Sequence, residues 1–136
     1  MLVEWDYFTH NELKCKCGCE DAPMKPEFME TLVEIRKEFD RPMVITSAFR
    51  CKEHNDSIGG AKDSPHRHGQ AVDVSVNLKD AYELICLSIR KGMTGIGVKQ
   101  NGLMAGRFIH LDNMKEAKGR PRPATQILSG PARERR

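Results

Sequence analysis

The sequence has no long hydrophobic segment, and its N-terminus has no basic leader. No apolar run approaches the ~18 residues of a membrane-spanning helix, and the first six residues, MLVEWD, include two acids where a secretory leader has basic residues. Internal repeats and low-complexity segments are absent. We therefore expect a chain that is cytoplasmic when synthesised, without a signal peptide or a membrane partner, so that any export uses another route.

Cysteine is present, but its spacing fits no common framework. The five cysteines are an odd number, which argues against a full set of disulfides in a chain that is not secreted. Cys15, Cys17 and Cys19 are closer together than the C-x-x-C of a zinc knuckle. With Cys51 they could form a second metal site or one redox-dependent bridge, and their redox state stays open. We interpret Cys86, in an apolar helical stretch, as a small core residue.

The charge is unevenly distributed. The net charge is +3, but residues 115–136 carry seven basic and two acidic side chains, a net +5, which leaves −2 for the remainder. The composition, with 39% hydrophobic and 30% charged residues, predicts one globular domain. We place this domain at residues 1–114, including an irregular, cysteine-containing segment at 1–24, and expect a basic, flexible tail at 115–136. The tail is short and lacks interleaved aromatic residues, which argues against a nucleic-acid partner. The oligomeric state stays open.

Hydrophobic periodicity predicts two helices. Residues 26–39 begin with proline and carry an apolar stripe made of Phe28, Leu32, Ile35 and Phe39. Asn77 can cap a second helix from 78 to about 90, and we expect its inward face to be Leu78, Ala81, Ile85 and Ile89.

Short apolar runs predict strands at 43–47, 71–76, 95–98 and 108–112, with a hairpin signal at 100–102. The polar, glycine-bearing stretch from 49 to 69 reads as a long loop with one helical turn near residue 54, and loops of that length are usually functional. The predicted fold class is α+β: a small, mostly antiparallel sheet with two packed helices.

The most informative motif is SPHRHGQAVD at 64–73, which reads S-x-H-x-x-G-x-A-x-D. His66 lies in a turn and Asp73 lies on the strand that follows it, so a short loop fixes their separation. His110 lies on the strand FIHLD at 108–112. Side chains alternate along a strand, and this alternation places Asp73 and His110 on the face opposite the apolar residues.

Together His66, Asp73 and His110 would supply three protein ligands and leave a fourth position for water, the ligand count of a catalytic zinc site holding one ion. Gly95 and Gly97 would leave open space on the same face for a substrate backbone. On spacing alone, other interpretations stay open: a strand aspartate can bond a loop, and a strand histidine can be a core residue.

A family resemblance supports the metal interpretation. ITSAFRC at 45–51, His54-Asn55, Ile58-Gly59-Gly60, the 64–73 motif, GIGV at 95–98 and FIHLD at 108–112 occur in order. Over roughly residues 8–113 the chain resembles the zinc D-Ala-D-Ala carboxypeptidases, and more closely their small phage- and prophage-associated branch, which has the hedgehog/D,D-peptidase fold.

The resemblance implies a zinc-dependent metallopeptidase that hydrolyses a peptide bond next to a D-amino acid in peptidoglycan stem peptides. Whether it is a carboxypeptidase or an endopeptidase, and which host wall it attacks, stays open. It would bind one zinc ion at His66, Asp73 and His110. An endolysin-like protein of this kind would reach the cell wall by holin-type release or as a virion component. A non-catalytic, zinc-stabilised wall-binding or phage structural domain of the same fold is the alternative.

The resemblance also suggests further site residues. Arg50 matches the family arginine that contacts substrate or stabilises the oxyanion, and Ser64 either caps the loop or binds substrate. Better-known relatives place Glu or His one to three residues before the last zinc histidine, but residues 104–109 hold no such group. The candidates for the general base are therefore Asp112, which could instead orient His110, and His68.

Overall fold

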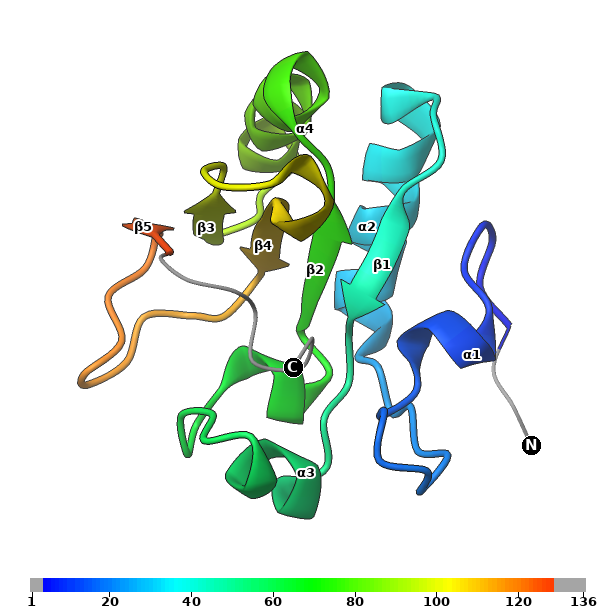
Figure 1. Cartoon of the computed structure of the whole chain (residues 1–136), viewed down its shortest axis with the longest axis vertical. Coiled ribbons are helices and arrows are strands. Elements are labelled where there is room, and N and C mark those ends of the chain that lie inside the picture. Colours follow the sequence, from blue (N-terminus) through cyan, green and yellow to red (C-terminus); the bar gives the residue numbers. More distant parts are fainter. Residues whose placement is uncertain (1–3, 129–136) are drawn as a thin grey trace.

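A five-stranded sheet forms the framework of the molecule. The computed structural model describes residues 4–128. Its strands are β1 (Val44–Ser47), β2 (Ala71–Ser75), β3 (Gly95–Lys99), β4 (Phe108–Asp112) and β5 (Ala124–Ile127), in the order β1-β2-β4-β3-β5. All neighbouring pairs are antiparallel except β3 and β5. The helices are α1 (His10–Leu13), α2 (Pro26–Phe39), α3 (Lys52–Ser57) and α4 (Leu78–Arg90) (Figure 1). The predicted α+β fold is confirmed.

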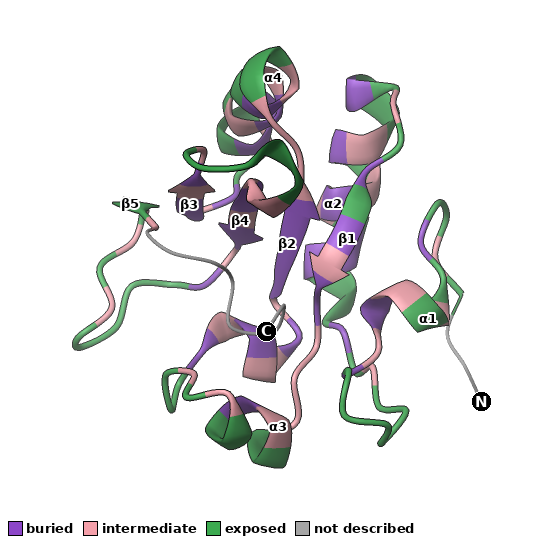
Figure 2. Cartoon of the chain, viewed as in Figure 1, coloured by how far each residue is buried: buried purple, intermediate pink, exposed green. Residues whose placement is uncertain are grey.

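Two helices cover one face of the sheet, as the sequence predicts. Val72 and Val74 of β2 and Ile109 and Leu111 of β4 pack into the same core as α2 and α4. The three middle strands are mostly buried, whereas β5 is largely exposed (Figure 2). The opposite face of β2 and β4 is therefore the one on which polar side chains can gather.

Helix α2 has the predicted ends and the predicted buried stripe. Pro26 occupies the first turn, where its missing N–H costs no helical hydrogen bond, and Asp40 ends the helix in a left-handed conformation. Phe28, Leu32 and Ile35 are completely buried. Burying side chains of this size stabilises the fold by about 1.5–3 kcal/mol each.

Helix α4 has the predicted bounds, but its inward face differs. Its buried residues are Ala81, Leu84, Leu87 and Ser88. The prediction that Leu78 and Ile89 face inward is wrong: they are 60% and 53% exposed. Cys86 is also exposed rather than a core residue. The helix is apolar on more than one side, so the 3.6-residue period does not by itself decide which side faces the sheet.

The domain extends beyond the predicted boundary at residue 114. β5 lies beside β3 (Figure 1). The two strands pair in parallel, with Ile96 opposite Thr125 and Val98 opposite Ile127. Residues 124–127 of the predicted flexible tail therefore join the sheet, and residues 115–123 connect them to β4. Residues 129–136 of that tail lie outside the described residues. No helix within residues 4–128 is long and apolar enough to cross a membrane.

The predicted irregular stretches also contain local structure. Within residues 4–24 the short helix α1 begins at a capping box in which Thr9 and Glu12 satisfy each other's backbone N–H. In the long loop, α3 and a 3-10 turn at Pro65–His68 fold the chain around Asn55, whose side chain is completely buried. The side-chain amide of Asn55 donates a hydrogen bond to the Ala61 carbonyl oxygen at 2.8 Å.

A chain that ends at residue 114 should be less stable than one that ends at residue 128. The shorter chain loses β5 and every contact of Arg122, which pairs with the buried Asp112. Removing one partner of a buried ion pair lowers the free energy of unfolding by several kcal/mol. The melting temperature should therefore fall by about 5 °C or more. Circular dichroism melts of the two chains measure this difference, and equal melting temperatures would contradict it.

Candidate metal centre

Three predicted ligands meet on the open face of the sheet. Asp73 of β2 and His110 of β4 are direct partners in the antiparallel register. His110 Nδ1 lies 3.0 Å from Asp73 Oδ1, and His66 Nε2 lies 3.3 Å from the same oxygen. The three ligand atoms all lie within 4.8 Å of one another. In a tetrahedral site with bonds of ~2.0–2.1 Å, the ligand atoms lie about 3.3 Å apart, so the spacing fits one zinc ion.

The second nitrogen of each imidazole has its own acceptor. His66 Nδ1 lies 2.7 Å from the Ala48 carbonyl oxygen. His110 Nε2 lies 2.8 Å from Asp112 Oδ2. An acceptor at the outer nitrogen fixes the ring orientation and leaves the inner nitrogen free to bind a metal, which is the usual arrangement for metal-binding histidines. Both histidines are therefore oriented for ligation.

The turn that carries His66 is fixed at both ends. Ser64 Oγ accepts a hydrogen bond from the His66 amide at 3.3 Å, and Pro65 occupies the first position of the 3-10 turn. Gly69 ends the turn at φ +67°, where a Cβ would lie 2.2 Å from the Pro23 carbonyl oxygen. Only glycine fits both the backbone conformation and this close approach. The glycine of the S-x-H-x-x-G motif therefore serves the geometry of the turn.

The charges at the centre stabilise one another. Burial alone would lower the pKa of His110, but hydrogen bonds to Asp112 and Asp73 outweigh it and raise the pKa to about 9. Burial would raise the pKa of Asp73, but the neighbouring imidazoles hold it far below its usual range. Before a metal binds, these interactions favour the protonated form of His110 between the two carboxylates at neutral pH.

Asp112 is held from several sides. Arg122 donates to both of its carboxylate oxygens, each at 3.0 Å, and the Met114 amide donates at 3.2 Å. Burial would raise the pKa of Asp112, but the bonds to His110 and Arg122 lower it to about 2. A Cβ on Gly95 would lie 2.3 Å from the Asp112 oxygens. The space that we expected above Gly95 for a substrate backbone is thus filled by the Asp112 carboxylate.

A cavity of about 560 Å³ opens over this cluster. Arg50, Ser64, Asp112 and Arg122 line it together with the three ligands. The Arg50 guanidinium donates to Asn55 Oδ1 at 3.1 Å, and the absence of a side chain at Gly60 leaves room for Asn55. Gly95 and Gly97 line this cavity as well. A Cβ on Gly97 would meet His110 and Leu128, so this glycine also makes room for the chain's own side chains.

One predicted site residue lies elsewhere, and the sequence interpretation missed two others. His68 does not line the cavity: its Nε2 lies 2.6 Å from Asp63 Oδ1, and its side chain is 40% exposed. The turn points His66 inward and His68, two residues later, outward. Arg122 was assigned to the tail and Asn55 to the loop. Pro121 and Pro123 on either side of Arg122 argue against a helix there, but no pattern in the sequence shows where this segment packs.

The family model described as Peptidase M15 matches residues 6–112. The chain belongs to the Peptidase M15 family. No curated protein matches the chain at a significant level. The match contains the three candidate ligands but ends before Arg122 and β5.

M15 membership agrees with the chemistry of the cluster. M15 peptidases are zinc-dependent, and two imidazoles with one carboxylate form a suitable donor set for that ion. This M15 chain is therefore a zinc metallopeptidase by family, and the family supports action on peptidoglycan in general. Its assignment to a phage-associated branch stays a prediction.

Zinc binding by the metal-free protein should release a proton from His110. Its pKa of about 9 means that the ring is protonated at pH 7, so the ion must displace that proton, whereas the nearby carboxylates are already ionised. Affinity should rise about tenfold per pH unit up to pH ~9. Calorimetric titration in buffers of different ionisation enthalpy measures the proton count.

His68→Ala is the matched control, because it removes an imidazole that lies outside the cavity. The number of protons released per bound zinc ion should be the same in this variant as in the wild type. A zinc affinity that does not change between pH 6 and 8 would contradict the structure of the metal-free centre.

Proposed function

We propose that the protein hydrolyses a peptide bond next to a D-amino acid in peptidoglycan stem peptides, using one zinc ion. The observation that carries the proposal is the convergence of His66, Asp73 and His110 at the base of a cavity in an M15 chain. The partner is then the stem peptide of the wall. Access by holin-type release or as a virion component remains a prediction.

In this proposal His66 Nε2, a carboxylate oxygen of Asp73 and His110 Nδ1 hold the ion. Zinc in such a site polarises a carbonyl and lowers the pKa of a water molecule toward 7. The Ala48 carbonyl and the Asp112 carboxylate keep the two rings in place, with contacts of 2.7 and 2.8 Å. The protein's contribution is therefore to fix the ligand geometry before substrate arrives.

Arg50 is the proposed substrate-binding and charge-stabilising group. Its guanidinium lines the cavity, and its backbone N–H donates to the His66 carbonyl at 3.1 Å, which ties it to the ligand turn. The contact with Asn55 fixes part of the guanidinium. A guanidinium can fork onto a substrate carboxylate or onto an oxyanion that develops during the reaction. Of the two roles considered for Ser64, its bond to the His66 amide supports the cap.

The geometry around Asp112 favours a role in orienting His110 over a role as the general base. A general base needs a free oxygen and a pKa near the working pH, but both Asp112 oxygens accept hydrogen bonds and its pKa is about 2. We therefore assign Asp112 as a positioning residue that orients His110, with Arg122 holding the carboxylate in place.

Purified protein should cleave stem peptides isolated from peptidoglycan. A chelator should stop cleavage, zinc should restore it, and His110→Ala should lower the rate by at least ~10³-fold because the metal is no longer held. Mass spectrometry of the products identifies the bond and shows whether cleavage is exo or endo. His10→Ala, on α1 and outside the cavity, is the matched control.

A protein that binds zinc stoichiometrically but cuts no linear or cross-linked muropeptide would overturn this proposal. That result would favour the alternative interpretation as a non-catalytic wall-binding or structural domain.

Asp112→Asn should weaken zinc binding by about 10–100-fold, which is the usual effect of losing a partner that orients a ligand. Cleavage should then recover when zinc is added in excess, because the reacting groups are still present. The measurement is kcat as a function of free zinc concentration, compared with wild type. A kcat that stays low at saturating zinc would instead assign Asp112 to proton transfer.

A further inference from the structure

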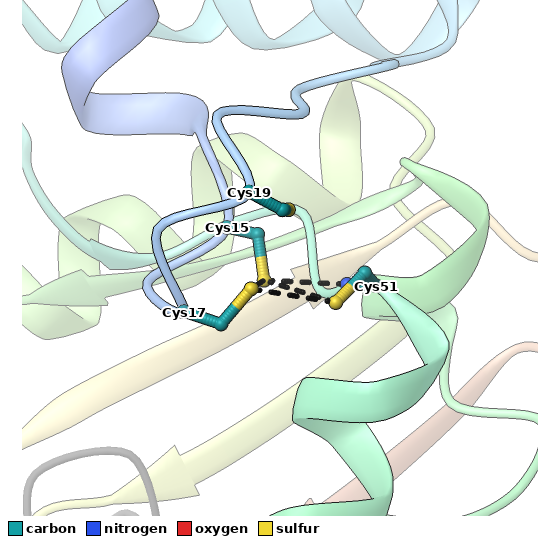
Figure 3. Close-up of side chains that lie close together, drawn as sticks. All are labelled: Cys15, Cys17, Cys19 and Cys51. Carbon is teal, nitrogen blue, oxygen red and sulfur yellow. Dashed lines mark hydrogen bonds between the residues drawn. The ribbon is translucent and has the colours of Figure 1, made fainter.

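Four of the five cysteines gather in a second group, which has no residue in common with the candidate ligands His66, Asp73 and His110. Cys15, Cys17 and Cys19 come from the turn after α1, and Cys51 is the N-cap residue of α3 (Figure 3). We call this group the cysteine cluster. Its four sulfur atoms all lie within 4.8 Å of one another. Residues 36 positions apart thus contribute to one site.

The sulfur spacing fits a metal better than it fits disulfides. Cys17 Sγ lies 3.5 Å from both Cys15 Sγ and Cys51 Sγ, and the Cys15–Cys51 sulfur distance is 3.7 Å. A tetrahedral zinc site with bonds of ~2.3 Å places its sulfurs about 3.8 Å apart, whereas a disulfide requires ~2.05 Å. The described cysteines are all free thiols. A single bridge would also leave two of the four sulfurs without a role.

The backbone around the cluster is arranged for sulfur ligands. The Cys51 amide donates to Cys15 Sγ at 3.3 Å, and the His54 amide donates to Cys51 Sγ at 3.4 Å. Backbone donors of this kind are typical partners of metal-bound thiolates, whose charge they stabilise. Gly18, at φ +92°, allows the chain to turn back so that alternate cysteines face one centre.

Ordinary core packing does not explain the cluster. Cys15 is buried, but Cys17 and Cys19 are exposed and Cys51 is half-buried. Exposed cysteines gain little from apolar burial. Four sulfurs at this spacing would repel one another as thiolates unless a cation neutralised them, and soft thiolate ligands in a tetrahedral set select zinc among the common divalent ions.

We propose that the cysteine cluster binds a second zinc ion, in a closed structural site with four thiolate ligands. The ion would fasten the turn after α1 to the start of α3. Cys51 follows Arg50 directly, so this fastening also sets one wall of the cavity over the metal centre. The site shares no ligand with His66, Asp73 and His110. It therefore stands whether or not the protein is a peptidase.

Zinc content per chain is the direct test. The protein is purified under reducing conditions without chelator, and its metal content is measured by inductively coupled plasma mass spectrometry. It should contain about two zinc ions per chain. The double variant Cys17→Ser/Cys19→Ser should contain about one, and His110→Ala should also retain about one. Cys86→Ser is the matched control, because it removes an exposed cysteine outside the cluster, and it should still contain two.

Cobalt substitution separates the two sites by their ligands. Co²⁺ in His110→Ala should show the thiolate-to-metal charge-transfer band of a sulfur-ligated ion, and Cys17→Ser/Cys19→Ser should lose it. Because His110→Ala leaves every cysteine in place, it gives an answer even if the cysteine variant does not fold. A His110→Ala protein with no zinc, or a wild-type intact mass lower by 2 Da from a disulfide, would overturn the proposal.

Discussion

The antiparallel register between β2 and β4 is the constraint on which the rest of the metal centre depends. It sets Asp73 opposite His110 and, by alternation, sends the valines, isoleucine and leucine beside them into the core. A slip of one residue would turn all of these side chains to the wrong face. The apolar residues that hold the sheet against α2 and α4 therefore also hold the ligands in place. In this fold, stability and metal geometry depend on the same strand pairing.

Around these ligands lies a second set of groups, drawn from widely separated parts of the chain. The Ala48 carbonyl follows β1, Asp112 ends β4, and Arg122 comes from the segment before β5. None of these groups is a candidate ligand: Ala48 contacts His66, Asp112 contacts His110, and Arg122 contacts Asp112. The cysteine cluster continues this pattern at a greater distance, because it anchors the segment from which Arg50 and α3 begin. Ligand placement thus depends on the pairing of two strands, whereas ligand orientation depends on groups from several parts of the domain.

The sequence predicts the parts of this structure that follow from periodicity. Strand alternation is enough to place Asp73 and His110 on one face, and the stripe on α2 is unambiguous. The prediction for the inward face of α4 fails because apolar residues occur on more than one of its sides. Packing against the sheet, rather than the pattern, decides which side is buried. β5 has four residues and little apolar character, so its parallel pairing with β3 leaves no periodic signal. The contacts of Arg122 and Asn55 depend on folding across the chain. The sequence suggests that Cys51 groups with the C-x-C-x-C cysteines, but only the fold shows that the four sulfurs lie at metal-binding distance.

Arg122 also affects the order in which the centre can be completed during synthesis. All three ligands have been translated once residue 110 is made, so a growing chain already contains the metal-binding side chains. The arginine that secures Asp112 emerges only afterwards, together with the strand that closes the sheet edge. Domains synthesised from the N-terminus fold as their last contacts become available. The final geometry of the centre therefore depends on synthesis of the segment that carries Arg122 and β5, and a chain that stops before this segment would contain the ligands but hold His110 less firmly.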